Sequence, residues 1–275
     1  MEVFRFRQGR SPLLVSMPHD GTYIPAEIAA GMTEAGLGVP DTDWHVSRLY
    51  DFLGAIGATV IQATHSRYVV DLNRSPSGAA LYAGQRNTEL CPVTCFDDRP
   101  IYKPGQAPDA PAIALRIGRF WRPYHDKLSA ALAELKARHG YALLFDAHSI
   151  RSRVPRFFEG RLPDLNLGTG DGLAASPAVS DAVTEEAARA SGYTHVLNGR
   201  FKGGYITRSY GRPTEGIEAV QLELAQATYM DEDPPFAFRE DLAAGLRPVL
   251  SRILAAMLSA GARRYRGAAG DRKAL

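Results

Sequence analysis

Short apolar runs alternate along this chain with longer segments whose apolar residues recur at helical spacing. Leu13–Met17 is stopped by Pro18, and residues 58–64, 141–146 and 218–224 are further apolar or β-branched runs typical of strands. Helical spacing occurs in residues 113–135, 180–190 and 242–257. Such alternation predicts an α/β fold, a mixed and mostly parallel sheet flanked by helices, with ligands beyond the carboxyl ends of the strands. We expect one domain over residues 1–275.

The segments between these runs carry further expectations. Residues 41–54 have the pattern of a capped helix, and residues 68–71 are strand-like. Residues 75–108 are rich in Gly, Pro and polar residues, which predicts a long loop of the kind that is usually functional. Pro123 must start, kink or divide the helix that contains it. The composition of residues 264–275 predicts a frayed tail.

Charge and composition limit the partners of this chain. Its 275 residues include 32 Lys and Arg against 30 Asp and Glu, a formal charge of +2. This balance does not favour nucleic acid or a membrane surface as a partner. The N-terminus lacks the apolar core of a signal peptide, and no run of about 18 apolar residues occurs. We therefore expect a cytoplasmic protein without a membrane span, whose oligomeric state the sequence does not indicate.

Nucleophilic catalysis by serine or cysteine has little support in the sequence. The two cysteines, Cys91 and Cys95, are spaced C-x3-C without a second pair that would complete a zinc ribbon. We expect them to be ordinary thiols, buried or partly exposed. The G-x-S-x-G pattern of a serine hydrolase does not occur.

Two of the seven histidines end apolar runs. His19 follows the first run and His148 follows the run that ends at Asp146, so both are expected to point into the ligand crevice. Zinc binds such rigidly mounted imidazoles together with a third protein ligand and an open position for water. The alternative is that both are hydrogen-bonded histidines without a metal.

A carboxylate could complete a metal site of this kind. Asp20, Asp41 and Asp43 lie near His19 in the sequence, and Asp146 could orient His148 from behind. Because the H-E-x-x-H motif does not occur, the chain is not a zincin.

Glu223 lies in the apolar stretch Val-Gln-Leu-Glu-Leu. A carboxylate within an apolar strand is unfavourable unless it is paired or functional. Burial would raise its pKa and suit it to work as a general base. The alternative is a glutamate that faces solvent on an edge strand.

Several arginines lie in segments that are expected to face the site. Their guanidinium groups bind carboxylates through paired hydrogen bonds, which predicts a small anionic substrate. The alternative for each of them is a solvated loop position. These arginines are Arg74, Arg151, Arg153, Arg156, Arg200 and Arg208.

The ordered combination of these motifs resembles the N-formylglutamate amidohydrolases, the N-formylglutamate deformylases of histidine breakdown. The resemblance covers residues 11–235, and the combination is more specific than any single motif. The matching stretches are Pro-His-Asp-Gly-Thr at 18–22, Asp-Thr-Asp-Trp at 41–44, Asp-Leu-Asn-Arg-Ser-Pro at 71–76, Asp-Ala-His-Ser-Ile-Arg-Ser at 146–152, Phe-Glu-Gly-Arg-Leu-Pro-Asp-Leu-Asn-Leu-Gly at 158–168, Gly-Gly-Tyr-Ile-Thr-Arg at 203–208 and Gln-Leu-Glu-Leu at 221–224.

The resemblance implies a fold similar to that of the zinc carboxypeptidases and aspartoacylases. It also implies hydrolysis of N-formyl-L-glutamate to L-glutamate and formate with one divalent metal, zinc, as the last step of a histidine degradation route. The implied metal ligands are His19, Asp43 and His148, and the implied base is Glu223. The implied carboxylate binders are Asn73 and Arg74, and we expect Arg151, Arg153 and Arg208 in the segments that face the site to bind substrate with them.

The sequence departs from these relatives at two positions. Zinc carboxypeptidases and aspartoacylases use a His-x-x-Glu pair, but Thr22 stands three residues after His19, so the carboxylate ligand must come from elsewhere. The resemblance favours Asp43, because it includes Asp-Thr-Asp-Trp at 41–44. Ser209 stands where the family resemblance leads us to expect histidine.

Two rival functions follow from the same residues. One is a related amidohydrolase that acts on another N-acyl amino acid, such as an N-acyl-aspartate. The other is a non-catalytic protein that binds acidic metabolites.

Overall fold

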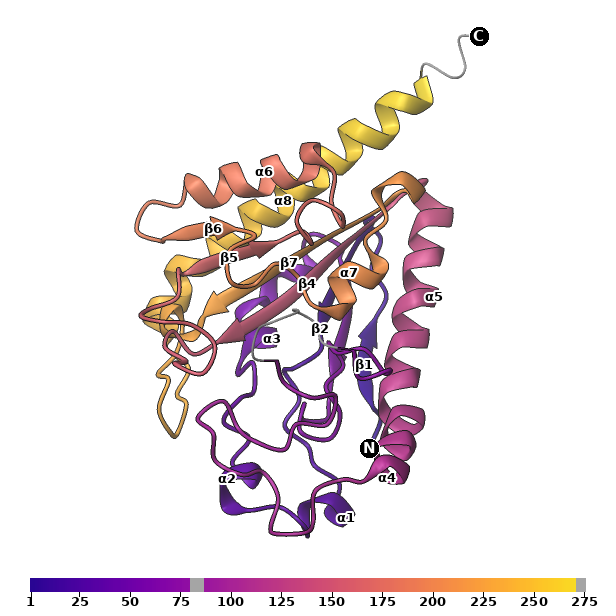
Figure 1. The fold of residues 1–275 in the computed structure, drawn as a ribbon. Coiled ribbons are helices and arrows are strands. Elements are labelled where there is room, and N and C mark those ends of the chain that lie inside the picture. The colour runs from indigo at the N-terminus through magenta and orange to yellow at the C-terminus, as the bar shows by residue number, and fades with distance from the viewer. Residues whose placement is uncertain (80–86, 271–275) are drawn as a thin grey trace.

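A seven-stranded sheet forms the centre of the molecule, with strand order β1-β3-β2-β4-β7-β5-β6 (Figure 1). The computed structural model describes residues 1–79 and 87–270, with side chains to residue 265. The pairs β1–β3 and β7–β5 are antiparallel and the other pairs are parallel, which confirms the expected mixed, mostly parallel sheet. The strands are β1 (Phe4–Arg7), β2 (Leu13–Met17), β3 (Thr59–Ala63), β4 (Ala142–Ile150), β5 (Leu165–Gly168), β6 (His195–Leu197) and β7 (Ile217–Ala225).

Helices cover both faces of this sheet, with α6 and α8 on one face and α5 on the other (Figure 1). Side chains alternate along β2, so Leu13 and Val15 pack toward α6 and α8 while Leu14 packs toward α5. The helices are α1 (Ala26–Ala29), α2 (Glu34–Leu37), α3 (Val46–Leu49), α4 (Ala110–Arg116), α5 (Arg122–His139), α6 (Pro177–Ala188), α7 (Tyr205–Tyr210) and α8 (Glu240–Gly270), with 3-10 turns at Asp51–Gly54, Pro213–Glu215 and Gln226–Thr228.

Residues 41–54 do not form the single helix that was predicted. They contain only α3 and the 3-10 turn Asp51–Gly54, which are preceded by an irregular segment. The cause is tertiary, because Asp41 bonds the Tyr68 hydroxyl and the Phe96 amide instead of capping a helix. His45 adopts a left-handed backbone with a φ of 62°, which separates this segment from α3.

The strand predicted at residues 68–71 is also absent, because this buried segment forms turns. Tyr68 hydrogen-bonds Asp41, and its carbonyl accepts a bond from the Tyr102 hydroxyl, so contacts across the chain replace a strand ladder. Residues 75–108 contain no helix or strand in their described part, as expected, and residues 80–86 of that loop lie outside the description.

The helix predicted across Pro123 is divided, as the proline requires. A π-helical segment at Ile117–Trp121 joins α4 to α5, and Pro123 lies in the first turn of α5, directly after this change in the hydrogen-bond pattern.

Helix α8 runs to Gly270, so the frayed tail expected from residue 264 is wrong as far as residue 270, and residues 271–275 lie outside the described part. Between Glu240 and Tyr265 this helix is long and apolar enough to span a membrane by length and composition alone. Its Leu246, Leu250 and Ile253 are buried against the sheet, as in a core helix of a globular domain.

Candidate metal and catalytic site

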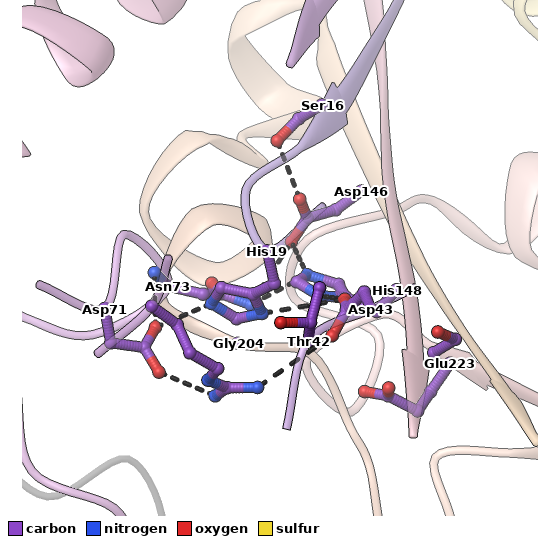
Figure 2. A network of polar contacts seen from close by, with 12 residues as sticks. Ser16, His19, Thr42, Asp43, Asp71, Asn73, Asp146, His148, Gly204 and Glu223 are labelled. Atoms are coloured by element: carbon purple, nitrogen blue, oxygen red, sulfur yellow. Dashed lines mark hydrogen bonds and ion pairs between the residues drawn. The ribbon is translucent and has the colours of Figure 1, made fainter. Parts of the chain in front are cut away.

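Three acid and imidazole side chains converge beyond the carboxyl ends of the central strands. His19 follows β2, His148 lies near the end of β4, and Asp43 comes from the irregular segment before α3 (Figure 2). Asp43 Oδ2 lies 2.9 Å from His148 Nδ1 and 3.6 Å from His19 Nδ1. One donor atom from each residue falls within 4.8 Å of the others, so this buried group could hold a metal ion.

Each imidazole is held from behind by a further carboxylate. His19 Nε2 lies 2.8 Å from Asp71 Oδ1, and His148 Nε2 lies 3.0 Å from Asp146 Oδ2. Ser16 on β2 donates a hydrogen bond of 2.9 Å to Asp146 in turn. When Nε2–H is donated to such a carboxylate, the Nδ1 lone pair of the same ring is available to a metal, and the outer carboxylate raises the basicity of the imidazole ligand.

Unpartnered atoms support a metal at this position. His19 Nδ1 and Asp43 Oδ1 are buried and have no hydrogen-bond partner among the described residues. Buried polar atoms in native proteins nearly always have partners, and a bound ion would provide one for both atoms. Two imidazoles and one carboxylate fit the protein ligands of catalytic zinc, which keeps a fourth position for water.

The two histidines and the aspartates around them stabilise one another's charges. Burial alone would raise the pKa of Asp43, but the neighbouring His19 and His148 outweigh it and hold the pKa below its usual value. Burial opposes protonation of His148, yet Asp146 and Asp43 raise its pKa well above the usual value. The cluster therefore favours positive charge between its carboxylates.

Glu223 lies beside this group on the neighbouring strand (Figure 2). Strands β4 and β7 pair in parallel with His148 opposite Glu223, so the strand register places the two side chains together. β7 is a central strand and Glu223 is only 8 % exposed, which excludes the solvent-facing alternative. Burial raises the pKa of Glu223 to about 8.

A cavity lies above these residues and has a cationic and aromatic lining. Arg67, Arg74 and Arg200 line it together with His19, His148 and Glu223. The remaining described lining residues are Asn73, Asn87, Thr88, Phe96, Ile150, Phe157, Phe201, Gly204 and Gln221. The arginines suit an anionic ligand, and the aromatic side chains exclude water around it.

Arg67 is a site residue that sequence reasoning missed, and Asp71 was noted only as the first residue of the Asp-Leu-Asn-Arg motif, without a role. Arg67 donates a 2.6 Å hydrogen bond to Asp71, and its Nη1 lies 3.9 Å from Asp43 Oδ1. The Arg67 guanidinium also stacks on Phe96 at 5.0 Å from the ring centroid. The available signal was the position of Asp71 at the start of the Asp-Leu-Asn-Arg motif, but this residue was assigned to the strand predicted at 68–71.

The Asp-Leu-Asn-Arg motif places Asn73 and Arg74 at the cavity. The Asn73 amide lies 2.9 Å from His148 Nε2, and its Oδ1 accepts a 2.8 Å bond from the Ile206 amide. Arg74 donates hydrogen bonds to the carbonyl and hydroxyl of Thr88, which hold its guanidinium on the cavity wall.

Three other predicted arginines lie apart from this cavity. Arg151 pairs with Asp233 at 2.7 Å and lines a different surface depression. Arg208 donates to the Gly203 carbonyl, and Arg153 is exposed. None of the three belongs to the described lining of the cavity, so their roles in substrate binding stay predictions. The cysteines Cys91 and Cys95 are buried free thiols, as expected.

Comparisons with known proteins give consistent matches. A family model described as N-formylglutamate amidohydrolase matches residues 11–230. A protein of Pseudomonas aeruginosa named N-formylglutamate deformylase is 52% identical over 96% of this chain and 99% of its own length. One of the same name from Pseudomonas putida is 50% identical over 96% of this chain and 98% of its own. The crystal structure of N-formylglutamate amidohydrolase from Ralstonia eutropha JMP134 superposes with a TM-score of 0.79 at 26% identity, covering 97% of this chain and 100% of that one.

Proposed function

The chain belongs to the N-formylglutamate amidohydrolase family, and we propose that it hydrolyses N-formyl-L-glutamate to L-glutamate and formate with one bound zinc ion. The observation that carries this proposal is the placement of Glu223 opposite His148 in the strand register, beside a buried group with unpartnered ligand atoms. A hydrolytic metal site needs this pairing of a metal ligand set with a separate base.

His19, Asp43 and His148 would hold the metal, with Asp71 and Asp146 fixing the two imidazoles. A divalent ion bound there supplies Lewis acidity, which makes water nucleophilic near neutral pH. His19 and His148 also line the cavity that contains the arginines, so substrate in this cavity would meet the metal there.

Glu223 would move the proton during hydrolysis. Its carboxylate takes a proton from the attacking water as the oxygen adds to the formyl carbon. The protonated carboxyl then gives this proton to the amide nitrogen as the carbon–nitrogen bond breaks, which releases formate and the amino group of glutamate. The buried position suits both steps, because burial raises the pKa of Glu223 to about 8.

The arginines would bind the two carboxylates of N-formylglutamate. Arg74, Arg200 and Arg67 all line the cavity. Arg67 differs from the other two because it also contacts Asp71 and Asp43 beside the proposed metal ligands. We assign Arg74 and Arg200 to the substrate carboxylates and Arg67 to the oxyanion that develops at the formyl carbon.

Formate release tests this proposal directly. We expect the purified protein to release formate from N-formyl-L-glutamate, to lose this activity after treatment with a chelator, and to regain it when zinc is restored. Turnover of N-acetyl-L-aspartate but not of the formyl substrate would assign the chain to another N-acyl amino acid. Thermal stabilisation by N-formylglutamate without turnover under any metal would instead indicate a binding protein.

We also propose that this reaction ends a histidine degradation route in the cytoplasm. The support is the family resemblance. A strain that lacks the protein should accumulate N-formylglutamate when histidine is the nitrogen source, and normal clearance of this compound would contradict the assignment.

A further inference from the structure

The proposed metal ligand Asp43 lies outside any helix or strand. The segment from Pro40 to His45 forms turns, so no ladder of backbone bonds fixes the carboxylate relative to the two imidazoles. Metal ligands must nonetheless be held within about 0.5 Å of their working geometry. The contacts of this segment therefore show what holds Asp43 in place.

Three consecutive residues, from Thr42 to Trp44, are hydrogen-bonded through their main-chain atoms to other parts of the chain. The Thr42 carbonyl accepts a 2.9 Å bond from Gln226 Nε2. The Asp43 amide donates a 3.1 Å bond to the His19 carbonyl. The Trp44 carbonyl accepts a 2.8 Å bond from the Tyr229 hydroxyl.

The two side-chain donors come from the end of the strand that carries the proposed base. Gln226 and Tyr229 follow β7 directly and are 2 % and 0 % exposed. Both also contact Ser149, whose hydroxyl lies 3.3 Å from Gln226 Nε2 and 2.7 Å from the Tyr229 oxygen. Ser149 is adjacent to His148 on β4, so this network joins the irregular segment to the strands of a second ligand and of Glu223.

We infer that Gln226 and Tyr229 are positioning residues that hold the Asp43 carboxylate at the metal site, an inference that rests on the proposed metal-dependent function. Neither side chain belongs to the described lining of the cavity, so neither contacts substrate there. They hydrogen-bond the main-chain carbonyls of the residues before and after Asp43, and so they limit movement of the Asp43 backbone. Loss of such outer partners typically weakens metal binding about 10–100-fold.

The zinc affinity of Tyr229→Phe tests this inference. Metal-free protein is titrated with Zn²⁺ in competition with a chromophoric chelator, and we expect the variant to bind about 10–100-fold more weakly than the unmodified chain. The matched control is Tyr265→Phe, which removes a hydroxyl bonded to the Pro213 carbonyl and Glu218 on the far side of the fold. This control should keep the original zinc affinity.

Gln226→Met provides a second variant that keeps the side-chain volume and removes the bond to Thr42. It should weaken zinc binding in the same direction, and in the background of Asp43→Ala neither variant should weaken it further. Equal affinities for the unmodified chain and both variants, or equal losses with and without Asp43, would overturn the positioning role alone. Failure of the unmodified chain to bind Zn²⁺ would overturn the metal centre and the positioning role together.

Discussion

At the scale of single residues, the site depends on buried groups whose charge states follow from their immediate neighbours. Glu223 is buried beside the proposed metal ligands without a cation bonded to it among the described side chains, and burial raises its pKa to about 8. Arg67 instead donates to Asp71 and so stays charged. Within one cavity, the raised pKa of Glu223 thus suits it to proton transfer, and the permanent charge of Arg67 suits it to bind an anion.

Replacement of Glu223 by glutamine should abolish most turnover. The amide keeps the volume but cannot accept a proton from water, so we expect kcat for formate release to fall about 10²–10⁴-fold. The measurement is steady-state release from N-formyl-L-glutamate at matched zinc content. A loss smaller than about tenfold would exclude Glu223 as the general base.

Arg74→Ala should weaken substrate binding more than turnover. The guanidinium is fixed on the cavity wall by Thr88, so its removal leaves a substrate carboxylate unpaired. We expect KM to rise by a factor that corresponds to a loss of about 2–5 kcal/mol of binding free energy. Arg153→Ala, an exposed position outside the described lining of the cavity, is the control, and unchanged KM in Arg74→Ala would remove Arg74 from the substrate site.

His125 should make the fold sensitive to acid. Burial lowers its pKa to about 4 even though Nε2 bonds the Leu72 carbonyl at 2.8 Å. Between pH 6.5 and about 4 the unfolded chain binds the proton and the native chain does not, so stability is complete above pH 6.5 and falls as pH decreases. The full difference is on the order of 3 kcal/mol.

The measurement is the free energy of unfolding by urea between pH 7 and pH 4. His125→Gln keeps a donor for Leu72 but cannot be protonated, so its stability should fall less steeply with decreasing pH. His195→Gln, at an exposed histidine, should keep the original slope. Identical slopes for all three proteins would show that His125 does not carry this dependence.

At the scale of elements, the start of α7 is built around Asn73. Gly204 precedes α7 and lies so close to Asn73 that an added Cβ would come within 2.2 Å of the amide nitrogen. The Gly204 amide also donates to Gln221 on β7, and Asn73 accepts from the Ile206 amide. Because Gly204 has no Cβ, the start of α7 can contact both the Asp-Leu-Asn-Arg motif and β7.

Gly204→Ala should therefore destabilise the protein and reduce its activity. The new methyl group must displace Asn73, and overpacking of this kind costs roughly 1–3 kcal/mol. The measurement is denaturant unfolding together with formate release. Gly118→Ala is the matched control, because an added Cβ there meets no atom within 4 Å. Equal stability of the two variants would contradict the proposed close approach.

The elements that the sequence predicted are those whose own residues determine them. Apolar runs identified β2, β3, β4 and β7, and helical spacing identified α5, α6 and α8. The strands β5 and β6 were missed because they are short and their pairing partners are distant. The helix predicted at 41–54 and the strand at 68–71 failed because Asp41 and Tyr68 bond each other instead of completing local structure.

The candidate site could be predicted to a similar extent. His19, His148 and Glu223 follow or occupy apolar runs, so the fold class alone places them near one edge of the sheet. Asp43 and Asp71 come from irregular segments, and Arg200 comes from the loop before α7. Only long-range contacts bring these residues to the site, Arg200 to the cavity lining and both aspartates to the residues around it, which is why periodicity could not show Arg67, Asp71 or Arg200 as a group.

At the scale of the whole molecule, the candidate metal group joins segments that are far apart in the sequence. His19, Asp43 and His148 come from the end of β2, from an irregular segment and from β4. A ligand that binds only the folded arrangement stabilises it by mass action. Zinc at about 100 times its dissociation constant should add about 2.7 kcal/mol to the free energy of unfolding. Asp43→Ala should lose most of this gain, and Asp126→Ala, at an exposed aspartate on α5, should keep it.

The pairing of His148 with Glu223 across β4 and β7 also bears on how such a chain can change during evolution. Their separation is set by the ladder between two buried central strands and not by the length of any loop. Insertions and deletions in the connections that carry Arg74, Phe96 and Arg200 can therefore reshape the cavity wall while the pair that we propose for hydrolysis stays in place. New acyl amino acid substrates can be acquired through the loops alone, without rebuilding the chemistry.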